Sequence, residues 1–275
     1  MRTILSLTTT HSRIHLLKYT LASLLDQTRS ADSILVNLSR EPYLLDQGIG
    51  ESPAWLTAMG EQGVEIQWVR NTGPYRKLLP ALDPAGKDDL VITCDDDVIY
   101  GPDWLRLLLK AAESHPDAIV CGRARRPVRN VFGMLQSYLN WPMVADNVKG
   151  HDLVPIGIAG VVYRSYLLAD TVIRSEDFLE LAPRQDDLWF NLAARAKGTP
   201  VVVAEGVNDQ VFPVQTRHNL SQANARGGEL AGWNRVLRAL VERLGLRIRA
   251  YAGVPVCDND RVFRRLLEYL ERPTD

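Results

Sequence analysis

Cysteine is scarce in this sequence, and long hydrophobic runs are missing from it. Three cysteines occur, Cys94, Cys121 and Cys257, and no two of them form a CxxC pair. Such wide spacing argues against a disulfide framework and against a cysteine-based zinc site, and it is typical of a reducing compartment. No apolar run approaches the roughly 18 residues needed to span a bilayer, and the first residues lack a signal-peptide pattern. We therefore predict a cytoplasmic protein.

A surplus of charge is also lacking. The chain has 32 Lys and Arg residues against 33 Asp and Glu residues, a formal net charge of -1. This balance excludes a protein that binds nucleic acid through its overall charge. With 46% hydrophobic and 24% charged residues, the composition excludes a disordered chain, and 275 residues suffice for one large α/β domain or two small ones. Because the overall composition indicates no function, the positions of the charged residues along the chain are the next source of evidence.

Short apolar segments alternate with helical patterns through the first half of the chain. Apolar runs predict strands at residues 3–7, 34–38, 64–69, 90–94, 118–121 and 201–203. Helical spacing predicts helices at residues 14–25, 102–112, 187–196, 221–246 and 260–270. Strand–helix alternation indicates right-handed βαβ units. We predict an α/β, Rossmann-like fold, in which residues 1–220 form a mostly parallel sheet flanked by helices and residues 221–275 form a C-terminal helical extension packed on it.

Three consecutive aspartates, Asp95, Asp96 and Asp97, directly follow the apolar run LVITC. Adjacent carboxylates repel one another, so a fold keeps them together where positive charge offsets them. In open α/β sheets, ligands bind outside the carboxyl ends of the strands. In an extended backbone Asp95 and Asp97 point to the same side, and carboxylate ligands suit Mg²⁺ or Mn²⁺. The aspartates therefore predict a metal site, with a solvated turn at the strand end as the alternative.

These aspartates lie in a stretch, VITCDDDVIYGPDWL, that resembles the DxD region of GT-A-fold glycosyltransferases, particularly the bacterial family-2-like group. The resemblance runs from the first strand to about His218. It implies a GT-A fold and a nucleotide-diphosphate sugar as donor, with a UDP-sugar favoured. It further implies a hexosyltransferase-like enzyme of polysaccharide biosynthesis whose acceptor is a saccharide or a lipid-linked molecule. In such an enzyme Asp95 and Asp97 hold Mn²⁺ or Mg²⁺, while Asp95 and Asp96 contact the donor.

Two segments match the donor side of that family. In the loop TTTHSR after the first strand, the resemblance implies that Thr8 and Arg13 contact the nucleotide, with Arg13 meeting the base or a phosphate. A plain helix N-cap at Ser12 accounts for the same loop. In the segment NTGPYRK, Lys77 resembles the family's basic residue near the donor, and cations near a helix N-terminus favour phosphate. A surface lysine on a helix is the alternative.

Two segments in the second half match the acceptor side. The resemblance implies that the run GIAGVVY, with Gly157 and Gly160, shapes the acceptor side of the cleft, where small residues let a sugar approach the backbone. A buried strand with a bulge is the alternative. In the segment DDLW, the resemblance makes Asp187 the catalytic base of an inverting reaction, with Asp186 in place of the usual Glu and Trp189 on the acceptor side. Capping and dipole effects also favour aspartates at a helix N-terminus.

Two features near the C-terminus have both a functional and a structural interpretation. His218, in the segment QTRHNLS, is predicted as a further metal ligand, since neutral imidazole binds such cations. An ordinary surface histidine is the alternative. Residues 233–251 combine arginines with leucines at helical spacing. This pattern predicts either peripheral contact with the inner face of an anionic membrane or a helix that packs on its own domain.

Other classes of protein also carry parts of this pattern. A haloacid-dehalogenase-type phosphatase has DxD at a strand end, but after the first strand, whereas here the motif follows a later one. A sugar nucleotidyltransferase would need a glycine-rich loop near the N-terminus, and TTTHSR has no glycine. We predict a metal-dependent, inverting glycosyltransferase. A DxD-type phosphatase and a catalytically inactive nucleotide- or carbohydrate-binding module are the alternatives.

Overall fold

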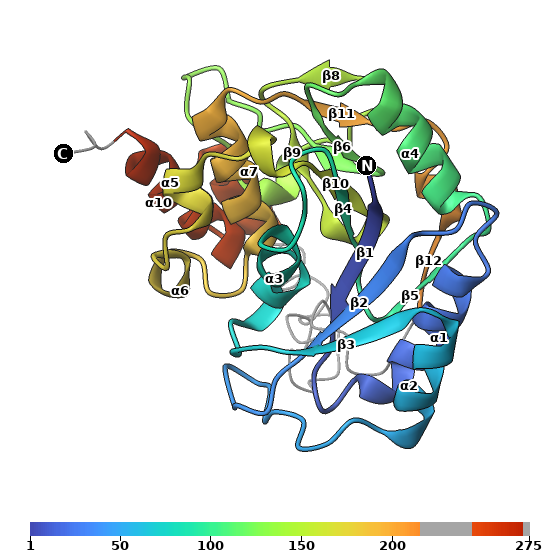
Figure 1. Cartoon of the computed structure of the whole chain (residues 1–275). Helices are drawn as coiled ribbons and strands as arrows, with labels where there is room; N and C mark the ends of the chain where they lie inside the picture. The colour runs from blue at the N-terminus through green and yellow to red at the C-terminus, as the bar shows by residue number, and fades with distance from the viewer. Residues whose placement is uncertain (215–243, 272–275) are drawn as a thin grey trace, which may run out of the picture.

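A computed structural model describes residues 1–214 and 244–271 of the chain. Its centre is an eight-stranded sheet with helices on both faces (Figure 1). Across the sheet the strands follow the order β3 (Val64–Trp68), β2 (Ser33–Leu38), β1 (Thr3–Thr8), β4 (Leu90–Thr93), β10 (Val161–Tyr163), β6 (Ile119–Cys121), β11 (Val201–Val203) and β8 (Lys149–Gly150). The β3–β2, β2–β1, β1–β4 and β6–β11 pairs are parallel, whereas β10 and β8 run antiparallel to their neighbours. The predicted α/β fold with a mostly parallel sheet is confirmed.

The helices divide between the two faces of the sheet (Figure 1). One face carries α1 (Ile14–Leu25), α2 (Ala54–Ala58) and α4 (Trp104–Ser114), and the other carries α3 (Leu79–Leu82), α5 (Asp170–Ile173), α6 (Phe178–Leu181), α7 (Asp186–Lys197) and α10 (Asp258–Leu270). Side chains alternate along a strand, so in β1 Ile4 joins one core cluster and Leu5 the other. The predicted stripe of α1 packs on the second cluster through Leu17, Leu21 and Leu24. Two apolar cores thus hold the central strands rigid.

Two short antiparallel strand pairs form sheets separate from the main one. One pairs β5 (Val98–Tyr100) with β12 (Val211–Pro213), and the other pairs β7 (Ala124–Arg125) with β9 (Val154–Pro155). The run GIAGVVY, for which a buried strand with a bulge is the alternative interpretation, follows β9 and forms a 3-10 turn at Gly157–Ala159 and then β10.

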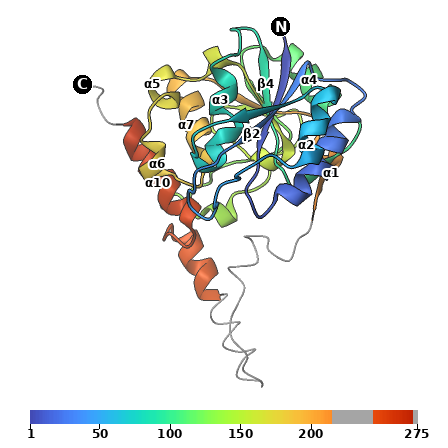
Figure 2. The same cartoon turned by 60° about the horizontal axis from the view of Figure 1, so that its bottom comes forward.

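The end of the chain packs against α7. From α10, Val262, Phe263 and Leu266 enter the same core cluster as α7. Residues 244–251 form a further helix that extends beyond the body of the molecule below α10 (Figure 2). His218 and most of the helix predicted at 221–246 lie outside the described residues, and the division at residue 220 stays a prediction. No helix of the described part is long and apolar enough to cross a membrane.

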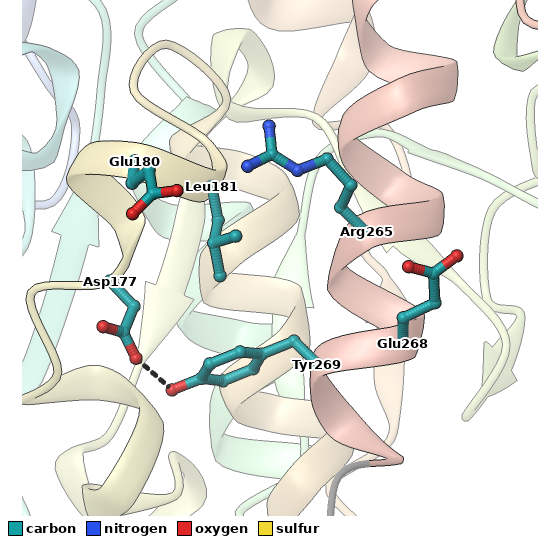
Figure 3. Close-up of a pocket in the computed structure, with 6 residues that line it drawn as sticks. All are labelled: Asp177, Glu180, Leu181, Arg265, Glu268 and Tyr269. Carbon is teal, nitrogen blue, oxygen red and sulfur yellow. Dashed lines mark hydrogen bonds between the residues drawn. The ribbon is translucent and has the colours of Figure 1, made fainter.

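A small polar cavity of about 270 Å³ separates α6 from α10 (Figure 3). Across it the Tyr269 hydroxyl donates a hydrogen bond of 2.7 Å to Asp177 Oδ2. The Trp189 ring lies 5.6 Å from that of Tyr269 and 6.0 Å from that of Phe178. This side of the molecule therefore serves to dock α10 on the domain.

Candidate active site

The strand order creates a crevice beside β1. The chain builds β1, β2 and β3 outward in one direction and then returns to place β4 on the other side of β1. Ligands of open α/β sheets bind where the order reverses in this way, outside the carboxyl ends of the strands. Here that position holds a cavity of about 360 Å³. Its lining includes the predicted donor-binding residues Thr8, Arg13, Lys77, Asp95 and Asp96.

The three consecutive aspartates have different surroundings. Asp96 is fully buried, and its carboxylate accepts hydrogen bonds from the Thr9 hydroxyl and the Arg13 guanidinium. Asp97 is partly exposed, and its Oδ2 lies 3.2 Å from Arg13 Nη1. Asp95 is also partly exposed, and its Oδ1 lies 3.3 Å from Lys77 Nζ. Each carboxylate of the motif is therefore held by a cation, as the repulsion between them requires.

Arg13 compensates the charge of this motif. Burial raises the pKa of Asp96 to about 6, although Arg13 and the Thr9 hydroxyl favour the ionised form. Burial would lower the pKa of Arg13, but the neighbouring carboxylates raise it above its usual value, so the guanidinium stays charged. Arg13 is also the N-cap of α1, and it makes no capping hydrogen bond through its side chain. The alternative of a cap at Ser12 is therefore wrong.

Lys77 lies at the centre of an ionic cluster. It ends the 3-10 turn Gly73–Lys77, and its side chain is buried. Its Nζ lies 2.8 Å from Asp186 Oδ2, 3.3 Å from Asp95 Oδ1 and 3.6 Å from Asp187 Oδ1. Burial alone would lower the pKa of Lys77, but these carboxylates raise it well above its usual value. The alternative of a surface lysine is wrong, because this ammonium joins the segment after β4 to the start of α7.

Asp186 and Asp187 begin α7, and neither is its N-cap, which is Gln185. Asp187 Oδ2 accepts a hydrogen bond of 2.8 Å from the backbone N–H of Gly157. Burial raises the pKa of Asp187 to about 6, Lys77 partly offsets this rise, and the charge of Asp186 adds to it. A carboxylate with such a pKa is mostly ionised at neutral pH and is a stronger base than an ordinary aspartate. Asp187 is thus suited to accept a proton.

Glycine is required at position 157 by the closeness of this cluster. A Cβ atom there would lie 2.7 Å from Asp187 Oδ1 and 2.7 Å from Lys77 Nζ. Gly160 has φ +87°, and a Cβ atom on it would lie 2.4 Å from Cζ2 of Trp104. Gly157 therefore belongs to the site, whereas Gly160 allows the chain to pack on α4.

Tyr100 fixes the segment that carries the aspartates. This buried residue of β5 accepts a hydrogen bond of 3.0 Å from the Asp95 backbone N–H and donates one of 3.2 Å to the carbonyl of Ile158. The hydroxyl thereby links the segment of the three aspartates to the turn that contains Gly157. Sequence reasoning did not single out Tyr100.

A second buried group missed at the sequence level is Asp46. It accepts hydrogen bonds from Arg76 Nη2 at 2.9 Å, from Asn71 Nδ2 at 3.1 Å and from the His11 backbone N–H at 3.1 Å. Burial would raise the pKa of Asp46, but these bonds together lower it. Asp46 and Arg76 line the cavity, together with Tyr43, Leu44, Leu45 and Arg184. No spacing marks Asp46 in the sequence, because its partners come from distant loops.

Trp189 does not lie on the acceptor side as expected. It is fully buried between α6 and α10, where its ring packs against Phe178 and Tyr269. It follows Asp186 by three positions on α7, yet it faces the core. The structure therefore assigns it to packing.

An α/β sheet with a cavity at the carboxyl ends of its strands, lined by carboxylates and basic side chains, is therefore the framework of the candidate site. Residues 7–167 match the model of "Glycosyl transferase family 2". Because this match covers more than half of the chain, the protein belongs to glycosyl transferase family 2. The resemblance to family-2-like GT-A glycosyltransferases, and with it the prediction of an enzyme of that class, is confirmed. No curated protein sequence matches the chain.

Several solved structures are similar to this chain at low sequence identity. Staphylococcus aureus TarS 1-349 is 16% identical, with a TM-score of 0.46, and the match covers 74% of this chain and 58% of that one. The same fragment in complex with UDP is 13% identical, with a TM-score of 0.46 and the same coverage. Francisella tularensis 2-C-methyl-D-erythritol 4-phosphate cytidylyltransferase (IspD) is 14% identical, with a TM-score of 0.46, over 82% of this chain and 99% of that one.

Proposed function

We propose that this family-2 protein transfers a sugar from a nucleotide-diphosphate sugar, with a UDP-sugar favoured, to a hydroxyl of a saccharide or lipid-linked acceptor. The observation that carries the proposal is the Lys77 cluster. One buried ammonium lies within 3.6 Å of the donor-side carboxylate of Asp95 and of the candidate base Asp187. The two halves of a transfer reaction are therefore adjacent in one cleft.

The cavity supports binding of a nucleoside diphosphate. At about 360 Å³ it falls in the size range of small-molecule sites. Tyr43, Leu44 and Leu45 supply apolar surface for a base, while Arg13 and Arg184 supply cations for a diphosphate. The donor-binding roles of Thr8, Arg13 and Lys77 rest on this arrangement.

Asp95 and Asp97 would hold the divalent cation, Mn²⁺ or Mg²⁺. They fit it because both carboxylates are partly exposed and offer the oxygen ligands that such cations prefer; the cation would compete with Arg13 for Asp97 and with Lys77 for Asp95. Within residues 1–214 and 244–271 no group of three or more potential ligands gathers, but Mg²⁺ needs only one or two carboxylates when substrate phosphates and waters complete its shell. When bound, the cation supplies Lewis acidity to the leaving diphosphate. His218, outside the described residues, stays a prediction as a ligand.

Asp187 is the base in this proposal. The Gly157 N–H and Lys77 hold its carboxylate, which accepts the proton of the acceptor hydroxyl as the new glycosidic bond forms. Attack from the face opposite the leaving diphosphate inverts the anomeric centre, through a transition state like the oxocarbenium ion of glycoside hydrolysis. Asp186 neutralises Lys77 and so leaves Asp187 free to titrate.

A screen of UDP-, GDP- and dTDP-sugars with Mn²⁺, read by mass spectrometry of donor hydrolysis and transfer, tests this function. Asp187→Asn should lower turnover by about 10²–10⁴-fold, the usual contribution of a general base, and leave UDP affinity nearly unchanged. Asp88→Asn, at an exposed aspartate, is the matched control. Turnover of Asp187→Asn at the wild-type rate would refute the base, and hydrolysis of simple phosphomonoesters without donor hydrolysis would favour a phosphatase.

The cytoplasmic location and the peripheral contact with the inner face of a membrane stay predictions. The sequence places that contact on residues 233–251, of which the structure describes those from 244 onward. These residues are helical, as predicted.

A further inference from the structure

Large apolar side chains gather on the surface where the segment after β7 meets the C-terminal segment. The Ser137 backbone N–H donates a hydrogen bond of 2.9 Å to the Ala250 carbonyl, and Asn130 Nδ2 donates one of 3.0 Å to the Tyr251 carbonyl. These contacts bring the two segments together. We call six exposed side chains on them the apolar rim: Val131, Phe132, Met134, Ile248, Tyr251 and Val254. Each is at least 42% exposed. Exposed apolar patches of this kind mark interaction sites.

The tip of the apolar rim is a preformed turn. The Asn130 N–H donates to the Met134 carbonyl at 2.9 Å, and Asn130 Oδ1 accepts from the N–H groups of Phe132 and Met134 at 2.9 and 3.0 Å. Gly133, with φ +77°, completes the turn. This bonding holds Val131 and Phe132 outward, where they are 82% and 81% exposed. The turn therefore presents two apolar side chains on a backbone that is already ordered, which lowers the entropy cost of binding.

The charged residues within the two segments that carry the apolar rim are all arginines. The carboxylates that follow in the sequence, Asp258 and Asp260, are paired with Arg261 and with backbone N–H groups. Residues 128–143 and 244–257 contain Arg129, Arg247 and Arg249 and no aspartate or glutamate. All three arginines are exposed. Apolar side chains that enter the acyl boundary, flanked by arginines that meet phosphates, complement an anionic lipid surface. A protein partner would have to supply both an apolar pocket and acidic groups at matching positions, whereas anionic lipids supply both without defined geometry.

The apolar rim is connected to the acceptor side of the cleft. Arg125, in β7, donates to the carbonyls of Tyr138 and Trp141 within the same segment. β7 pairs with β9, which leads directly into the turn at Gly157, beside Asp187. The neighbouring helix of residues 244–251 extends away from the domain (Figure 2).

We propose that the apolar rim and its three arginines dock the protein peripherally on an anionic lipid bilayer. The docking does not depend on transferase activity, so it can hold or fail independently of the proposed function. The full-length protein is sedimented with vesicles of phosphatidylcholine and phosphatidylglycerol, and separately with vesicles of phosphatidylcholine alone. We expect binding to the anionic vesicles, weaker binding at higher salt, and little binding to the neutral ones.

Two variants test the apolar and the electrostatic contributions to vesicle binding. Phe132→Glu should weaken binding at least tenfold, because it places a like charge at the tip in contact with anionic lipids. Arg247→Gln combined with Arg249→Gln should weaken it by about fivefold for each arginine. Tyr19→Glu, at an aromatic residue of α1 that is 51% exposed, is the matched control and should bind as the wild type does. Circular dichroism melting verifies that each variant is folded.

Three results would overturn the proposal. The first is no binding of the wild type to anionic vesicles at low salt. The second is wild-type binding by Phe132→Glu. The third is a wild type that sediments as a dimer without lipid and dissociates in Phe132→Glu, which would assign the apolar rim to a second copy of the chain. If the second result comes with a lower melting temperature of Phe132→Glu, it assigns the apolar rim to packing against another part of the same chain.

Discussion

The ammonium of Lys77 lies 2.8 Å from Oδ2 of Asp186, and both side chains are buried. This pair lies between the aspartates that follow β4 and the carboxylate at the start of α7. A buried charge is tolerated only when it is paired, so each member of the cluster depends on the others. The chemistry of the cleft and its stability are therefore coupled through one side chain.

Removal of Lys77 should destabilise the fold. In Lys77→Met the carboxylates of Asp95, Asp186 and Asp187 would face one another without a cation, at a cost of about 3 kcal/mol in the free energy of unfolding at neutral pH. The loss should shrink in acid, where the carboxylates protonate. Urea denaturation followed by circular dichroism measures it, with Lys18→Met, at an exposed lysine of α1, as control. Equal stability of Lys77→Met and wild type at pH 7 would contradict the assigned ion pairs.

Asp187→Asn should not lower the stability of the protein at neutral pH, although we expect it to lower turnover. The folded pKa of Asp187 is about 6, above the value of about 3.8 for an ordinary aspartate. Between these values the folded state binds more protons than the unfolded state, so this residue makes stability fall as pH rises. In Asp187→Asn this decrease of stability with rising pH should be absent, so the variant should melt at or above the melting temperature of the wild type at pH 7. Melting temperatures of the wild type and of Asp187→Asn, measured from pH 4 to pH 7, test this prediction. A clearly lower melting temperature of the variant at pH 7 would count against the raised pKa of Asp187.

Gly157→Ala should impair catalysis more than folding. The added methyl group would displace Asp187 and Lys77 from their present positions, since its carbon would lie only 2.7 Å from a side-chain atom of each. A displacement of about 1 Å at the base costs about 100-fold in turnover. Gly60→Ala is the matched control, because a Cβ atom there meets nothing within 4 Å. A variant at position 157 with wild-type turnover would show that Gly157 does not position the base.

Loss of the carboxylate at Asp97 should weaken metal binding. Asp97→Asn should reduce Mn²⁺ affinity by at least about tenfold, because substitution of residues that merely hydrogen-bond to metal ligands already lowers affinity by that much. Titration of Mn²⁺ in the presence of UDP, followed by electron paramagnetic resonance, measures this without turnover. Asp103→Asn, at the start of α4, is the control. EDTA should likewise lower UDP affinity in the wild type, and unchanged affinity in both experiments would exclude a metal at this motif.

Much of the fold could be read from the sequence because strand and helix periodicities are local. The apolar runs became β1, β2, β3, β4, β6 and β11 with shifts of a residue or so at their ends. The position of the aspartates at the edge of the sheet also followed, since parallel strands end at a common edge. The 3-10 turn at Gly157–Ala159 could not be read, because its conformation depends on contacts with Asp187 and Tyr100.

The sequence by itself determined which carboxylates follow β4 and begin α7, and which family the chain resembles. Only the tertiary structure decided how their charges are balanced. A lysine after a glycine–proline turn is as consistent with a solvated side chain as with a buried one, and Trp189 is as consistent with a cleft as with a core. The physical reason is that burial, and hence charge pairing and pKa, depends on segments that are distant in sequence, and these meet only when β1, β4, α7 and the turn at Gly157 pack together.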